Sequence, residues 1–107
     1  MDYSKAVQTA REKIPESVSS HEILSQVLED FLEDIPVLLE KIDLSLEEGD
    51  LKGVEGAAHQ LKGISGTFGL HDLSAVSGEL EWACRESEEC ESVREKKLAL
   101  FAELGLT

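Results

Sequence analysis

The chain has 107 residues, enough for one domain with a single hydrophobic core and too few for an additional nucleotide-binding catalytic domain. Its 23 acidic and 10 basic residues give a formal net charge of −13, so a nucleic acid backbone and an anionic membrane surface would both repel it. No apolar run approaches the roughly 20 residues of a membrane-spanning helix, and the first residues lack the apolar core of a secretory signal. We therefore expect a cytoplasmic protein that binds neither nucleic acid nor membranes.

Hydrophobic residues recur at helical spacing and almost never alternate, which predicts an all-α fold. A short first helix is expected from about Tyr3 to Lys13, stopped by Pro15. A long second helix should begin at a capping box formed by Ser19 and Glu22 and end near Gly49. The broad apolar stripe of this helix comprises Ile23, Val27, Leu28, Phe31, Ile35, Leu38, Leu39, Ile42 and Leu46.

Pro36 lies inside this long helix and predicts a bend rather than a stop. Gly49 as the residue after the helix and Asp50 as the next N-cap predict a tight turn between antiparallel helices. Further helices are expected over about 51–67 and 71–85, and another after the polar segment 86–91. This order predicts an antiparallel up-down four-helix bundle, with the short N-terminal helix packed across it, in one domain spanning residues 1–107.

The segment "AAHQLKGISGTFG" within the helix expected over 51–67 places one histidine and one lysine among glycines. With Val54 at the centre of the buried stripe and about 100° per residue, His59 falls on the water-facing side. The residues expected to share the buried stripe with Val54 are Leu51, Ala58, Leu61 and Ser65.

Glycines surround His59 on this face, at Gly56, Gly63 and Gly66. Each costs about 1 kcal/mol relative to alanine in a helix interior. Bare backbone would let another protein approach the imidazole closely, and the ammonium of Lys62 could meet an anion carried by the ring. An exposed histidine is, however, usually only solvated, and glycines also mark close helix contacts or fraying ends. The geometry alone favours neither interpretation.

The run from Ala58 to Gly63, with Gly69 and Leu73 after it, resembles the signature of histidine-containing phosphotransfer (HPt) domains, roughly A-H-x-L-K-G-x-x-x-x-x-G-x-x-x-L. The stretches "FLEDIPVLLEKIDLSLEEGD" and "LSAVSGELE" are similar to the flanking helices of that family. The motif-bearing core thus covers about residues 21–88.

The resemblance implies that His59 is a nucleophile that accepts a phosphoryl group from the phosphoaspartate of a receiver domain and passes it to another receiver. It also implies that Lys62 offsets phosphate charge and that Gly63 keeps the approach clear. The sequence lacks a G-x-x-x-x-G-K-[ST] loop, so we expect a phosphotransfer protein rather than a kinase. We expect no bound cofactor, Mg²⁺ on the partner receiver, and a monomer that works with response-regulator receivers or a hybrid histidine kinase.

Two alternatives stay open. The chain could be the phospho-accepting domain of a larger hybrid or chemotaxis-type histidine kinase, or a non-catalytic helical adaptor that docks a response regulator. The register of the turn at Gly49 puts His59 level with about Glu40, so Pro36, Leu39 and Glu40 would border the docking surface. For Leu39, a core position is the better interpretation.

No other constellation predicts a site. His21, His71, Cys84 and Cys90 have no recognised zinc-ligand spacing, so no metal site and two reduced thiols are expected. Trp82 is expected to be a partly buried packing residue, with partner contact as the alternative. The acidic clusters at 47–50 and 86–91 are interpreted as solvated faces and connectors.

Overall fold

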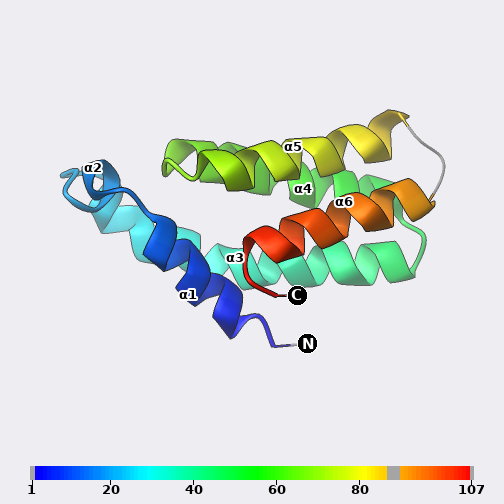
Figure 1. The fold of residues 1–107 in the computed structure, drawn as a ribbon, viewed down its shortest axis with the longest axis horizontal. Coiled ribbons are helices and arrows are strands. Elements are labelled where there is room, and N and C mark those ends of the chain that lie inside the picture. The colour runs from blue at the N-terminus through cyan, green and yellow to red at the C-terminus, as the bar shows by residue number, and fades with distance from the viewer. Residues whose placement is uncertain (1, 87–89, 107) are drawn as a thin grey trace.

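The computed structural model describes residues 2–86 and 90–106, which contain helices and no strand. The helices α3 to α6 form an antiparallel bundle, and α1 packs across α3 near the chain's N-terminus (Figure 1). The predicted all-α bundle is therefore confirmed. The bounds are α1 Ser4–Lys13, α2 Glu16–Ser19, α3 Leu24–Glu47, α4 Leu51–Thr67, α5 His71–Glu86 and α6 Cys90–Glu103.

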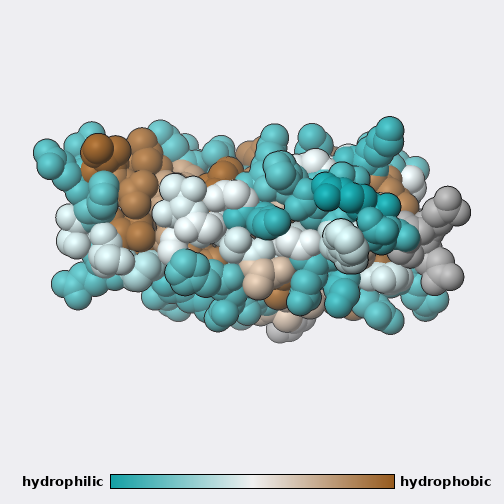
Figure 2. All heavy atoms as spheres, turned by 90° about the horizontal axis from the view of Figure 1, so that it is seen from above, coloured by the Kyte–Doolittle hydropathy of each residue, from teal (hydrophilic) through white to brown (hydrophobic). Residues whose placement is uncertain are grey.

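The stripe predicted for the long second helix forms much of the core along α3. The helix continues through Pro36, as expected. Ile23 and Val27, however, are 67% and 41% exposed, so the first part of the predicted stripe is not buried. The start of α3 projects beyond the end of the α4–α5 pair, which leaves little to cover it (Figure 1). Figure 2 shows hydrophobic residues gathered at this same end of the molecule.

The capping box predicted at Ser19 and Glu22 is also wrong. Ser19 closes the additional short helix α2, and its hydroxyl lies 3.3 Å from the carbonyl oxygen of Glu16. The start of α3 is capped by the imidazole of His21, whose Nδ1 accepts the backbone N–H groups of Ile23 and Leu24 at 3.1 Å. An acceptor close to the first turn satisfies N–H groups that have no partner within the helix.

The predicted turn between α3 and α4 is confirmed. Gly49 has a φ of +74°, a conformation that favours glycine, and the Asp50 carboxylate accepts the N–H of Gly53 at 3.0 Å. A Cβ atom on Gly53 would lie 2.5 Å from Oγ of Ser45, so the two helices approach closely just after the turn. These contacts set the position of α4 against α3 and therefore the level of His59 along the bundle.

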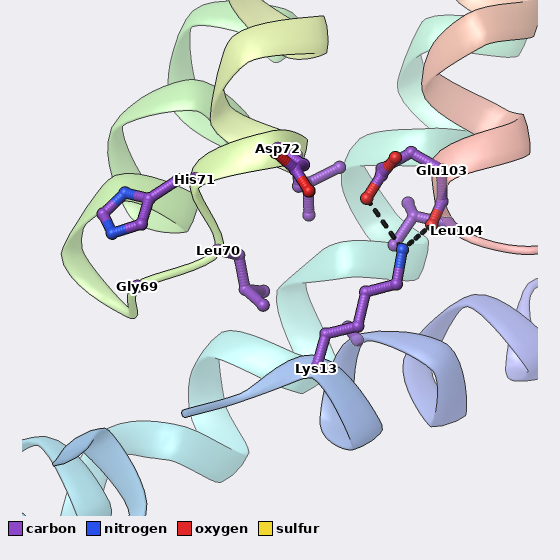
Figure 3. A pocket seen from close by; sticks show the side chains of 9 residues that line it. Lys13, Gly69, Leu70, His71, Asp72, Glu103 and Leu104 are labelled. Atoms are coloured by element: carbon purple, nitrogen blue, oxygen red, sulfur yellow. Dashed lines mark hydrogen bonds and ion pairs between the residues drawn. The ribbon is translucent and has the colours of Figure 1, made fainter. Parts of the chain in front are cut away.

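Polar contacts at both ends hold α1 in place. The hydroxyl of Tyr3 donates to the Asp43 carboxylate of α3, which also pairs with Lys97 of α6. At the other end of α1, Lys13 Nζ lies 2.7 Å from Oε1 of Glu103 at the end of α6 (Figure 3). The small N-terminal helix is thus tied to both α3 and α6.

Candidate functional site

His59 lies on the outer face of α4, with 71% of its side chain exposed. A Cβ atom on Gly56 or Gly63 would meet no other atom within 4 Å, and one on Gly66 would meet only Oγ of Ser74, at 3.5 Å. The surface around the imidazole is therefore open, as the helical spacing predicts. The buried face of α4 is also close to the prediction, since Val54, Ala57, Ala58, Leu61 and Ser65 are buried and Leu51 is half-buried.

The imidazole of His59 is bonded to a buried carboxylate from the neighbouring helix. Oε2 of Glu81 in α5 lies 2.7 Å from Nδ1 of His59, and the Glu81 side chain is only 8% exposed. An ionised carboxylate accepts hydrogen bonds and cannot donate them, so the proton in this contact belongs to Nδ1. In a neutral imidazole held this way, the lone pair is on Nε2, the ring nitrogen not engaged by Glu81.

Two cations pair with the same carboxylate. Nη2 of Arg85 lies 3.0 Å from Oε2 of Glu81, and Nζ of Lys62 lies 3.9 Å from Oε1. Arg85 also reaches Glu55, at 3.3 Å. Among residues 2–86 and 90–106, Glu81 is the only charged residue that is buried, and burial of a charge requires such partners. Lys62 and Arg85 are both half-exposed, so their positive charge is also available to an anion on His59.

The sequence singled out His59 and Lys62 as candidates but did not point us to Glu81 and Arg85, which the structure places beside them. A signal was present, because Glu81 follows Leu73 and Ser77 at intervals of four and so lies on the inward face of α5. A charged residue on the buried face of a helix indicates a partner from another helix. Arg85, four residues after Glu81, is the pairing partner that helical spacing offers.

The structure does not bring Pro36 and Glu40 to the surface around His59. Glu40 lines a cavity of about 570 Å³ together with Tyr3 of α1 and Lys97 of α6. Ser45 faces α4, and Pro36, nine residues earlier, lies about 180° around α3 from it. The turn predicts only how far along the bundle each residue lies. The rotation of α3 about its own axis puts Pro36 and Glu40 on the side of α3 that faces away from α4.

The remaining candidates do not form a site. Leu39 is fully buried and belongs to the core, which is the interpretation that the sequence favoured. His71 is exposed at the start of α5, and no group of three or more potential metal ligands comes together in the described part of the chain. The side chain of Cys90 lies outside the described residues, as do Glu88 and Glu89 of the acidic segment. Trp82 is 61% exposed, so its assignment as a packing residue is wrong.

Cys84 is buried, which makes its thiol less reactive. Burial, with a smaller contribution from Glu55, raises the pKa of its thiol from 9.0 to about 11. The unfolded chain therefore releases this proton from about pH 9 upward while the folded chain keeps it, so stability falls as the pH rises through this window.

We expect this thiol to lower the free energy of unfolding by on the order of 1 kcal/mol between about pH 8 and pH 10.5. Urea unfolding of the wild type and of Cys84→Ala at both pH values measures the effect, because other alkaline titrations are common to the two proteins. The decrease should be smaller in the variant. An equal decrease would show that Cys84 does not titrate differently on folding.

Another hollow lies away from His59. It has a volume of about 310 Å³ and lies where α1, the α4–α5 connection and the end of α6 meet (Figure 3). Lys13 lines this hollow, and its Nζ donates hydrogen bonds to the side chain of Glu103 at 2.7 Å and to its backbone carbonyl at 2.9 Å. The charged side chain in this hollow therefore holds α1 against the end of α6. The groups around His59, in contrast, form an open surface.

Comparison with known proteins gives one clear match. A family model described as "Hpt domain" matches residues 26–104, which is most of the chain. Neither the curated proteins nor the solved structures gave a significant match. In addition, none of the helices within the described ranges has the length and apolar character needed to cross a membrane.

Proposed function

Because the chain belongs to the Hpt domain family, we propose that His59 is the residue that carries a phosphoryl group. Members of this family carry phosphoryl groups on histidine in two-component signalling and have no kinase activity of their own. It accepts a phosphoryl group from the phosphoaspartate of a receiver domain and passes it to another receiver. The observation that carries this proposal is the mostly exposed imidazole bonded through Nδ1 to the buried Glu81. We expect the protein to act as a monomer in the cytoplasm.

The proposed step uses this geometry. The lone pair of Nε2 attacks the phosphorus of the phosphoaspartate, an N–P bond forms, and the P–O bond to the aspartate breaks to leave its carboxylate. The ring gains positive charge while Nδ1 keeps its proton, and the carboxylate of Glu81 stabilises that charge. Return to a second receiver is the reverse reaction, in which an aspartate oxygen attacks the phosphorus and Nε2 leaves with its lone pair.

The cations of the cluster offset the charge that arrives with the phosphoryl group. Phosphoryl transfer depends chiefly on positioning and on charge neutralisation. Lys62 and Arg85 are both held near His59 by the same carboxylate. We expect Mg²⁺ to be supplied on the receiver, and this chain to contribute the nucleophile, the group that orients it and the two cations.

The test is incubation of the protein with several phosphorylated receivers. A label that is acid-labile and base-stable supports the relay. No label from any receiver, with binding retained, would favour the non-catalytic adaptor. Label obtained only from a histidine kinase loaded with ATP, and never from a receiver, would instead favour the phospho-accepting domain of a longer kinase.

Glu81 is a positioning residue, and two substitutions separate its roles. Glu81→Ala removes the acceptor for the Nδ1 proton, and misplacement of a reacting group by about 1 Å can slow a reaction 100-fold. We expect Glu81→Ala to slow transfer roughly 10- to 100-fold. Glu81→Gln keeps an oxygen acceptor for Nδ1–H, so it should recover much of that loss.

The measurement is the initial rate of transfer, together with the ¹⁵N chemical shifts of the His59 ring. In the wild type and in Glu81→Gln the shifts should report a proton on Nδ1, and in Glu81→Ala a mixture of the two forms. If Glu81→Ala transfers at the wild-type rate, Glu81 does not position the ring.

A further inference from the structure

Trp82 is the only tryptophan of the chain, and 61% of it is exposed. It directly follows Glu81, whose carboxylate touches the His59 ring at 2.7 Å. On a helix, adjacent residues differ by about 100° in direction, so Trp82 faces outward where Glu81 faces α4. A large exposed aromatic side chain beside a reactive histidine needs an explanation that core packing does not provide.

An open groove of about 520 Å³ runs across α5 beside this tryptophan. Lys62 of α4 lines one side, Lys96 of α6 lines the other, and Gly78 lies between them. A Cβ atom on Gly78 would lie 3.4 Å from Cδ of Lys62, so the stem of this lysine lies over the glycine. Lys62 is therefore part of both the groove and the His59 cluster, and the two form one continuous surface.

A protein that docks on His59 is large enough to contact α5 as well. A specific interface covers about 800 Å² on each protein, which corresponds to a disc of roughly 16 Å radius. Packed helices lie about 8–10 Å apart, so a protein centred on His59 would also cover the outer face of α5. Tryptophan and arginine are the side chains most often found to dominate binding energy in such interfaces.

The charges beside His59 suit the same partner, whereas those of the groove are balanced. Lys62 and Lys96 line the groove together with Glu79 and Glu86, and Nζ of Lys96 lies 3.8 Å from Oε2 of Glu79. The cations next to His59 are Lys62 and Arg85, in a chain of net charge −13. A receiver pocket that holds a phosphoaspartate and a divalent cation presents carboxylates and phosphoryl oxygens around its opening. Cations gathered beside His59 would attract that opening and orient it.

We propose that Trp82 and the α5 groove are part of the receiver-docking surface, with the indole as its apolar anchor. This inference rests on the proposed function and extends it, because it directs the docked receiver toward α5 and α6. It replaces the docking rim expected at Pro36 and Glu40 on α3.

Binding and transfer are measured separately. Trp82 reports its own environment when a tryptophan-free receiver variant is titrated in, and burial of the indole should move its emission to shorter wavelength. Calorimetric titration should show Trp82→Ala binding that receiver at least tenfold more weakly, the size expected of an interface anchor. Leu98→Ala on α6 is the matched control, because Leu98 is 55% exposed and does not line the groove.

Each outcome decides a different claim. A receiver that binds and transfers phosphate while Trp82 emission and the affinity of Trp82→Ala stay unchanged overturns the docking inference and leaves the proposed function intact. A receiver that binds with shifted emission but leaves no label supports the docking inference and contradicts the relay. If no receiver binds, both are overturned. Circular dichroism of each variant checks that the helices are retained.

Discussion

Replacing His59 with asparagine is expected to reduce receiver-dependent labelling to background. Asparagine keeps a polar amide that can donate to Glu81, but it has no nitrogen lone pair capable of attacking phosphorus. Because the His59 side chain is 71% exposed, the free energy of unfolding should change by less than about 1 kcal/mol. Labelling by a phosphorylated receiver and urea unfolding of the same preparation measure the two effects.

The chain provides its own controls for this substitution. His71 is exposed at the start of α5, and His21 is exposed and caps α3. His71→Asn and His21→Asn should both label like the wild type, since asparagine is also a good N-cap residue. Labelling that persists in His59→Asn and disappears in either control would assign the carrier to a different histidine.

Replacing Gly63 with leucine is expected to slow transfer about 100-fold while stabilising the protein, because the side chain would hold the receiver away from His59. A Cβ atom at this position meets nothing within 4 Å, so the fold has room for it. Loss of a glycine from a helix interior is favourable by about 0.5–1 kcal/mol. Transfer and stability should therefore change in opposite directions.

Two further variants make this prediction sharper. Gly63→Ala should gain the same helix stability with a much smaller loss of rate, since a methyl group obstructs little. Ala99→Leu on α6 adds a comparable apolar side chain at an exposed position of another helix and should leave the rate unchanged. If Gly63→Leu loses helical circular dichroism in proportion to its loss of rate, obstruction of docking is not the cause.

The sequence predicted well those features that depend on short-range signals. The start of α4 at Leu51 follows from the Asp50 cap and from the glycine that ends the preceding helix, and its end at Thr67 lies just before Gly69, whose φ is +77°. The exposure of His59 then follows from helical geometry alone, because it requires only the direction of one residue relative to the buried stripe of its own helix.

Features that depend on how one helix is rotated against another were not predicted. The contact between Glu81 and His59 joins residues 22 apart, and it requires knowing which side of α5 packs on α4. Glu40 was expected beside His59, but it lines a cavity with residues of α1 and α6. The exposed position of Trp82 was missed for a related reason, because composition favours burial of an aromatic residue whatever its direction.

The most direct test of the central claim is ³¹P NMR of the protein after phosphorylation by a receiver. An imidazole bonded to Glu81 through Nδ1 and open at Nε2 should give one phosphohistidine resonance, with the phosphorus on Nε2. The resonance should be absent from His59→Asn. A phosphorus on Nδ1, or a protein that receives phosphate on any residue other than His59, would contradict the account.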